Sequence, residues 1–266
     1  MKNSSPGRKT WKLKPRSSLV SQLVADAKVT PLQAQLLANR DLTDADAIQS
    51  FLFPRLSQMM DPMRMKGMDE AVKSIVLAME EHEKITVYGD YDADGLTATA
   101  LLATFLSHLG LSVGTYVPDR LKEGYGLNEA AVKNIRENGT GMIITVDCGI
   151  SNDMEVGLAK RLGMDVVITD HHLVPSGFQP QCPVINPHQP GCSFPFKGLS
   201  GVGLAFFLAV GLRAALREKG WFKTGNEPDL RDYLDLVALG TMADRVPLLG
   251  QNRATHPVVW GIRLWG

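Results

Sequence analysis

Residues 84–95, KITVYGDYDADG, decide the fold, because a short apolar and β-branched run leads directly into three aspartates. The run predicts a buried strand over residues 84–89. Asp90, Asp92 and Asp94 follow at positions i, i+2 and i+4, which lie on one side of an extended chain. Carboxylates this close raise one another's pKa unless cations neutralise them, so a divalent metal is the simplest partner for this segment.

Two further segments have the same form. The apolar run MIITV is followed by Asp147, and the run VVIT is followed by Asp170, His171 and His172. Every candidate ligand therefore stands where a predicted strand ends, which is where open α/β sheets bind their ligands. Oxygen-rich sites with one or two imidazoles favour Mn²⁺ or Mg²⁺, whereas structural zinc sites use thiolates or more histidines. The three segments together indicate metal-dependent hydrolysis of a phosphate ester.

Each of these motifs has a simpler interpretation when it stands alone. An isolated Asp-x-Asp is common in turns and helix caps, and an isolated pair of histidines usually belongs to a surface or a core. The metal site is favoured because all three motifs stand at the ends of predicted strands.

Strand and helix patterns alternate through the middle of the chain, which predicts an α/β fold with a doubly wound, mainly parallel sheet flanked by helices. A helical pattern from Met68 precedes the first strand, and two helices, 202–219 and 229–242, follow the last one. The alternating elements are strand 84–89, helix 96–109, strand 112–117, helix 128–138, strand 142–147, helix 151–162 and strand 165–169.

Local signals mark several helix ends. Thr43 or Asp44 is the candidate N-cap of a short helix, and Asn128 or Ser151 can cap the helices that follow them. Residues 1–35 show few periodic signals, so no helix is predicted there.

Length and composition are typical of an intracellular enzyme. The chain has 266 residues, 44% of them hydrophobic, and no formal net charge at pH 7. Cys148, Cys182 and Cys192 do not form a disulfide framework, which favours the cytoplasm, and the last two with His188 lack a fourth ligand for zinc. No apolar run reaches the length of a membrane span and no signal peptide is evident, so a soluble cytoplasmic protein is predicted.

Basic side chains gather at the N-terminus. In the first 28 residues a single acid, Asp26, stands against Lys2, Arg8, Lys9, Lys12, Lys14, Arg16 and Lys28. Such an arm can follow a phosphate backbone, although a solvated, frayed terminus is the more frequent structure. Overall neutrality does not exclude a nucleic-acid substrate, because the acidic metal centre supplies part of the negative charge.

Seven segments carry a family resemblance, in this order: DYDADG, PDRLKEGYGLN, VDCGIS, ITDHH, INPHQPGC, LSGVGLAFF and DLVALGTMADRVPLLGQNR. They resemble motifs of the DHH phosphoesterase superfamily and, within it, the RecJ family of bacterial single-strand-specific exonucleases. The likeness runs from about Thr43 to Arg253. It implies a metal-dependent 5′-to-3′ exonuclease that digests single-stranded DNA in repair and recombination, with a single-strand-binding protein or a helicase as partners.

The resemblance assigns five side chains to a centre of two divalent ions, Mn²⁺ or Mg²⁺. The expected ligands are Asp92, Asp94, Asp147, His171 and Asp244, with Asp147 bridging the ions. Two ions about 4 Å apart lower the pKa of a shared water and neutralise the leaving oxygen, so no covalent nucleophile is required.

Supporting catalytic positions go to Asp90, Asp170 and His172. A carboxylate there can orient a ligating imidazole, and a second histidine can contact the scissile phosphate. Cys148 stands next to Asp147 but has no predicted base to activate it, so it is interpreted as a packing residue.

Four residues are candidates for substrate binding. Arg120 could hold a phosphate, and Tyr125 could stack on a base, which is worth about 1–3 kcal/mol per base. The alternative is a surface arginine beside a turn tyrosine. Ser200 and Gly201 precede a long predicted helix whose first N–H groups could bind phosphate, although close helix packing explains the glycine equally well.

The resemblance also divides the chain. It implies a basic arm and short helical lead-in over residues 1–70, a catalytic domain over 71–250, and a divergent tail over 251–266 at the start of a connecting helix. RecJ-type proteins continue into a second domain and an OB-type module, which implies a partial or shortened chain. Metal binding depends less on those segments than processive digestion does.

Two other functions remain open. One is a DHH phosphodiesterase acting on short oligonucleotides or cyclic dinucleotides, and the other is an inactive fragment that binds nucleic acid. The phosphodiesterase relatives usually carry a histidine upstream of the first motif, where this chain has Tyr88. All five ligand positions are intact, which argues against a degenerate relative.

Overall fold

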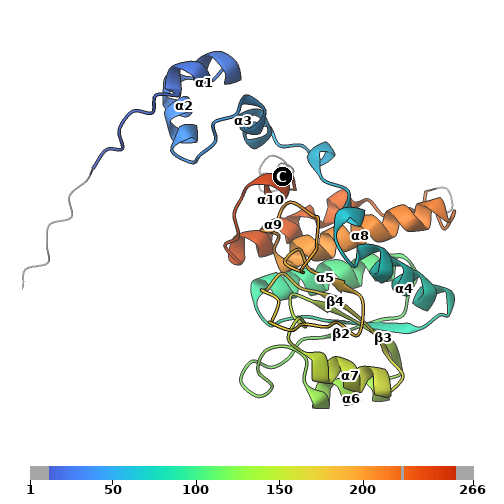
Figure 1. Cartoon of the computed structure of the whole chain (residues 1–266). Coiled ribbons are helices and arrows are strands. Elements are labelled where there is room, and N and C mark those ends of the chain that lie inside the picture. Colours follow the sequence, from blue (N-terminus) through green and yellow to red (C-terminus); the bar gives the residue numbers. More distant parts are fainter. Residues whose placement is uncertain (1–11, 223–224, 256–266) are drawn as a thin grey trace, which may run out of the picture. The chain divides into compact units, whose positions relative to one another are not determined.

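The computed structural model describes residues 12–222 and 225–255, and the chain divides into two compact units, Met1–Phe53 and Pro54–Gly266 (Figure 1). The boundary expected from the sequence lay at residue 70 instead. Residues 54–70 belong to the second unit, because Met65 and Met68 are buried in its core.

The first unit contains three short helices, α1 (Val20–Ala27), α2 (Pro31–Ala38) and α3 (Ala45–Leu52). Thr30 and Gln33 form a capping box at the start of α2, and the Asp44 carboxylate caps α3 by accepting a hydrogen bond from the N–H of Ala47. Helices α1 and α2 were not predicted. Two turns are too short to show a clear periodic face, so the capping box was the only strong signal of α2.

Part of what was inferred for the two termini lies outside the described residues. This applies to Lys2, Arg8 and Lys9 of the basic arm and to residues 256–266 of the tail. The described beginning of the tail forms a short helix, α10 (Gly250–Ala254).

The second unit is organised around a parallel sheet with the strand order β2-β1-β3-β4-β5. Its strands are β1 (Lys84–Tyr88), β2 (Val113–Tyr116), β3 (Thr140–Val146), β4 (Asp165–Thr169) and β5 (Val184–Ile185). The predicted fold class is confirmed, with the first four strands close to their expected bounds. The fifth was missed because a two-residue strand has no measurable period.

Alternate residues of the strands point to opposite faces of the sheet. Ile85 and Val87 belong to one apolar cluster, whereas Tyr88 belongs to the other. In β3, Ile144 lies in the first cluster and Ile143 in the second. Both faces are therefore buried, which is why the strands appear in the sequence as nearly continuous apolar runs.

Helices cover both faces (Figure 1). One face packs against α4 (Met68–Glu80), α5 (Ala93–His108), α8 (Gly201–Glu218) and α9 (Leu234–Ala243), and the other against α6 (Glu129–Glu137) and α7 (Asp153–Arg161). No helix within the described ranges combines the length and the hydropathy needed to cross a bilayer.

Three helix starts differ from the prediction or refine it. Helix α5 begins at residue 93 instead of 96 because the Asp92 side chain caps it. Asn128 caps α6 as predicted, whereas Ser151 does not cap α7, whose N-cap is Asn152. The helix expected from residue 229 begins as a 3₁₀ turn, Leu230–Tyr233, and continues as α9.

The strand order reverses between β1 and β3, since the chain passes from β1 outward to β2 and later from β3 outward to β4. This arrangement leaves a crevice at the carboxyl ends of β1 and β3, the topological switch point where open sheets bind ligands. Asp90 follows β1 and Asp147 follows β3. The fold thus brings the first two acidic segments to one place.

Leu101 and Leu96 of α5 provide a matched test of the core, because Leu101 is fully buried and Leu96 is 48% exposed. We expect Leu101→Ala to lower the free energy of unfolding by about 2–5 kcal/mol through lost burial and a cavity. Leu96→Ala should change it by less than about 1 kcal/mol. Denaturant unfolding of both variants measures this, and equal losses would contradict the packing described for α5.

Candidate metal centre

The acidic segments converge at the switch point into one cluster, which we call the carboxylate cluster. Donor atoms lie within 4.8 Å of one another in three overlapping groups, which share Asp147 and His171. The groups are Asp147 with His171 and His172, Asp94 with His171 and Asp244, and Asp90 with Asp92 and Asp147. All five predicted ligands are therefore brought together, and Asp90 and His172 join them.

Asp147 is placed by an unusual backbone conformation. Its φ angle is +62°, in the left-handed region that aspartate tolerates better than most residues. Its N–H continues the sheet by donating to the Thr169 carbonyl at 3.0 Å. A side chain on Gly201 would place Cβ 2.5 Å from Cβ of Asp147, so only glycine allows α8 to start this close.

Asp94 joins the cluster to helix α8. Its carboxylate is buried and accepts hydrogen bonds from the N–H of Gly201 at 2.6 Å and of Val202 at 2.9 Å. The unpaired N–H groups and positive dipole end of α8 stabilise the negative charge. Asp92 is exposed and accepts from the N–H groups of Asp94 and Gly95, which fixes the first turn of α5 against the cluster.

His171 is the central base of the cluster. Its Nε2 lies 3.1 Å from Asp147 Oδ1, 3.7 Å from Asp244 Oδ2 and 4.0 Å from Asp94 Oδ2. Asp244 is the C-cap of α9, just beyond the helix as the sequence predicted. One imidazole nitrogen thus faces three carboxylates from three different elements.

Asp170 orients the second histidine. Its buried Oδ1 lies 2.7 Å from His172 Nδ1, and its Oδ2 accepts from the N–H of Ile150 at 2.9 Å. The carboxylate-to-imidazole arrangement that the sequence suggested is present, but the oriented ring is His172 and the ring among the carboxylates is His171. Asp170 thus fixes the orientation of the half-exposed His172 ring through its Nδ1 atom.

The pKa values of Asp94, Asp147 and His171 are raised because these groups lie close together in a buried cluster. Burial raises the pKa of Asp147 to about 7 and that of Asp94 to about 6, against an ordinary 3.8. Burial disfavours the charged form of His171, but the adjacent Asp147 carboxylate, and then Asp244 and Asp94, raise the pKa of His171 to about 9. Without cations, protons must therefore compensate the negative charge.

Unsatisfied oxygens show that the cluster fits a cation. Within the described residues, three buried side-chain oxygens have no hydrogen-bond partner: Oδ1 of Asp90, Oδ1 of Asp147 and Oδ2 of Asp244. The short distance from His171 to Asp147 Oδ1 does not have hydrogen-bond geometry. Buried acceptors without donors are costly, and a hard divalent cation such as Mn²⁺ or Mg²⁺ prefers this mixture of carboxylates and one imidazole.

Arg120 and Tyr125 lie beside the cluster, as predicted for residues after β2. The Arg120 guanidinium lies over the Tyr91 ring at 5.3 Å from its centroid, and its charge opposes the rise in the pKa of Asp90, which burial causes. The Tyr125 hydroxyl donates to the Asp147 carbonyl at 3.2 Å, and its ring meets His172 edge-on.

Ser200 and Gly201 have other partners than the phosphate suggested for them. Gly201 donates its N–H to Asp94, and the buried Ser200 side chain lies 3.0 Å from Thr241 Oγ1 and accepts from the N–H of Gly203. The N-terminus of α8 is thus occupied by a carboxylate of the protein. Close packing, the alternative considered for the glycine, is what the structure shows.

The segment after β5 was assigned no role from the sequence. Asn186 is buried there and donates from Nδ2 to the His172 carbonyl at 2.9 Å, while its Oδ1 accepts from the N–H of His188 at 2.8 Å. The pKa of His188 is lowered by burial and then by the charge of His171. The sequence signal that could have indicated these residues is the polar segment from Asn186, which follows the short apolar pair Val184–Ile185.

The cysteines take no part in the cluster. Cys148 is fully buried, and burial raises its pKa well above the ordinary value, in agreement with a packing role. Cys182 packs on the α6–α7 side of the sheet and Cys192 on the opposite side, so no zinc site forms from them with His188.

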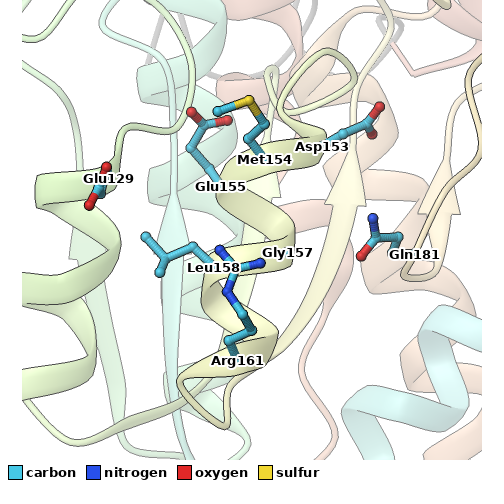
Figure 2. A pocket seen from close by; sticks show the side chains of 8 residues that line it. All are labelled: Glu129, Asp153, Met154, Glu155, Gly157, Leu158, Arg161 and Gln181. Carbon is cyan, nitrogen blue, oxygen red and sulfur yellow. The ribbon is translucent and has the colours of Figure 1, made fainter.

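A hollow of about 410 Å³ lies elsewhere, along α7 (Figure 2). Glu129, Asp153 and Glu155 line it together with Arg161, so its lining has a net negative charge. None of the predicted site residues contributes to it. The hollow has no imidazole and none of the buried oxygens without a partner, so the carboxylate cluster is the better candidate site.

Comparison with known sequences agrees with this site. The DHH family, N-terminal domain, matches residues 84–241, more than half of the 266-residue chain. The chain belongs to the DHH family. Among curated relatives it is 44% identical over 244 residues to the single-stranded-DNA-specific exonuclease RecJ of Bacillus subtilis (strain 168), covering 91% of this chain and 29% of the relative. It is 41% identical over 230 residues to the enzyme of the same name from Escherichia coli (strain K12), covering 85% and 39%.

Solved structures give the same result. The crystal structure of exonuclease RecJ bound to manganese has a TM-score of 0.62 and 38% identity, covering 72% of this chain and 46% of that one. RecJ from Thermus thermophilus in complex with Mn²⁺ has a TM-score of 0.70 and 30% identity, covering 92% and 33%. The family resemblance read from the motifs is confirmed. This chain spans 29% and 39% of the two curated relatives described above.

The raised pKa values predict how pH affects stability without metal. Asp94, Asp147 and His171 hold protons in the folded state that they release when unfolded, so stability is lost as pH rises through about 6, 7 and 9. We expect the Tm of the metal-free chain to fall between pH 6 and pH 8, and Mn²⁺ to raise the Tm more at pH 8 because it competes with fewer protons. A Tm gain from Mn²⁺ that is larger at pH 6 would contradict this assignment.

Gly201→Ala tests the contact between α8 and Asp147. The new Cβ requires Asp147 or the start of α8 to shift, so we expect at least about tenfold weaker Mn²⁺ binding by titration calorimetry. Gly211→Ala is the matched control on the same helix, since its Cβ would meet the nearest atom at an ordinary 3.5 Å. Equal affinity in both variants would rule out the proposed constraint.

Proposed function

We propose that this chain hydrolyses phosphodiester bonds of single-stranded DNA with Mn²⁺ or Mg²⁺, acting as a 5′-to-3′ exonuclease of DNA repair and recombination. The observation that carries the proposal is the group of buried carboxylate oxygens without donors at the switch point of a DHH-family sheet. The names of the relatives, single-stranded-DNA-specific exonucleases, support the substrate class.

The proposed ligands are the five residues predicted from the family motifs. They are Asp92, Asp94, Asp147, His171 and Asp244. Divalent cations bound there would supply Lewis acidity, polarising the phosphodiester and activating water near neutral pH. The shared position of Asp147 in two of the three groups supports a bridging role for it.

The Asp170–His172 pair is proposed to stabilise charge on the phosphate. The hydrogen bond that the His172 Nδ1–H donates to Asp170, aided by the negative charge of this carboxylate, raises the pKa of His172 and favours the doubly protonated ring. With Nδ1–H held by Asp170, the ring can donate its other N–H to a non-bridging phosphate oxygen. Asp90 is proposed to add negative charge on the β1 side of the cluster, where it groups with Asp92 and Asp147.

Arg120 and Tyr125 are the proposed substrate contacts. Arg120 is exposed and close to the cluster, so its guanidinium can pair with a phosphate. Tyr125 is 48% exposed, and its ring can stack on an unpaired base, an interaction that does not depend on sequence. A duplex cannot present its bases this way, which supports single strands as the substrate.

Partner proteins and location are part of the same proposal. A single strand must first be released from duplex DNA, so a helicase or a single-strand-binding protein is a suitable source of substrate. The three cysteines are free, which supports the reducing environment of the cytoplasm.

Asp147→Asn is the decisive variant, because asparagine tolerates the +62° φ angle while losing the negative charge. We expect the chain to release nucleotides from 5′-labelled single-stranded DNA in Mn²⁺, and the variant to lose more than about 100-fold in rate. Asp41→Asn is the matched control, since exposed Asp41 has a φ of +60° outside the site. Full activity of Asp147→Asn would contradict the proposed centre, and release from the 3′ end would contradict the polarity.

A further inference from the structure

The loop between β2 and α6 carries both proposed substrate contacts but has little apolar support of its own. Residues 119–125 include no buried side chain, and Leu121 at their tip is 94% exposed. Packing therefore holds this loop only weakly. The Tyr125 hydroxyl is bonded directly to the Asp147 carbonyl, but the backbone around Arg120 needs another support.

The Glu123 carboxylate provides that support. Glu123 Oε1 accepts hydrogen bonds from the Tyr116 hydroxyl at 2.5 Å and from Asn128 Nδ2 at 3.1 Å, and its Oε2 accepts from the N–H of Asp119 at 2.7 Å. The donors come from the end of β2, the start of the loop and the N-cap of α6. Glu123 thus connects three separate points around Arg120.

Tyr116, which donates to Glu123, is itself held by Tyr88 at the end of β1, close to the carboxylate cluster. Tyr116 stacks on the buried Tyr88, with ring centroids 5.1 Å apart and an interplanar angle of 13°. The Tyr88 hydroxyl donates to the Gly126 carbonyl at 2.9 Å, which fixes the other end of the loop. Tyr88 is the last residue of β1, two positions before Asp90.

We propose that Glu123 is a positioning residue that holds Arg120 beside the carboxylate cluster through its bonds to Tyr116, Asp119 and Asn128. The inference rests on the proposed function for what Arg120 binds, whereas the anchor itself rests on geometry. The hydrogen bond from Tyr116, with that from Asp119, lowers the pKa of Glu123, so the carboxylate stays ionised and strongly bound. Without it, the Asp119–Glu123 turn loses its hydrogen bonds to Tyr116 at the end of β2 and to Asn128 at the start of α6.

A double-mutant cycle separates positioning from a general structural effect. We expect Glu123→Ala to raise KM for single-stranded DNA about tenfold with a smaller change in kcat, and Arg120→Ala to raise it similarly. If Glu123 acts mainly through Arg120, the double variant should be no worse than Arg120→Ala alone. Losses that multiply would overturn the proposal.

Conservative variants sharpen the cycle. Tyr116→Phe keeps the stacked ring and removes one donor, and Glu123→Gln keeps an acceptor, so both should fall between wild type and Glu123→Ala. Glu129→Ala is the control, because Glu129 is exposed at the start of α6 and forms its ion pair with Lys133 of the same helix. A rise in KM for Glu129→Ala equal to that for Glu123→Ala would overturn the assignment.

Amide hydrogen exchange tests the anchor even if the chain does not digest DNA, an outcome that would count against the proposed function alone. In Glu123→Ala we expect exchange over residues 119–125 to become about tenfold faster while β3 keeps its protection. Unchanged exchange in the loop would overturn the anchor whatever the activity.

Discussion

Electrostatic repulsion among buried carboxylates is the constraint on which the rest of this structure depends. Asp94, Asp147 and Asp244 converge on one imidazole from the ends of different elements. Bringing such charges together without compensation would oppose folding. The surrounding structure can be understood as the means of keeping them in place.

The compensation comes from several sources. Two N–H groups of α8 bind Asp94, and the imidazole of His171 faces the other carboxylates. Gly201 lets the start of α8 approach Asp147, whose own backbone is held in the left-handed region. The oxygens that remain without donors are the part that only protons or cations can satisfy. Strain and unsatisfied groups of this kind are concentrated at functional sites.

The sequence predicted the sheet and the convergence of its acidic segments because both follow from the local pattern. A β-branched run followed by aspartate identifies a strand and its carboxyl end, and parallel strands place those ends on one edge. Asp244 is different: it belongs to a helix end distant in sequence, so only the family motif could assign it. The partner of Asp94 was equally hidden, since the Ser-Gly-Val-Gly segment is compatible with binding either a ligand phosphate or a side-chain carboxylate. Glu123 gave no signal because its three partners are fixed by the conformation of a loop, and the two-residue β5 was too short to reveal that Asn186 and His188 stand at the same edge.

Anomalous diffraction from crystals of this chain soaked in Mn²⁺ would test the central claim most directly. We expect manganese peaks bounded by Asp92, Asp94, Asp147, His171 and Asp244, at the junction of β1 and β3. Manganese found only at other acidic surfaces, such as the hollow along α7, with none at the switch point, would contradict the claim.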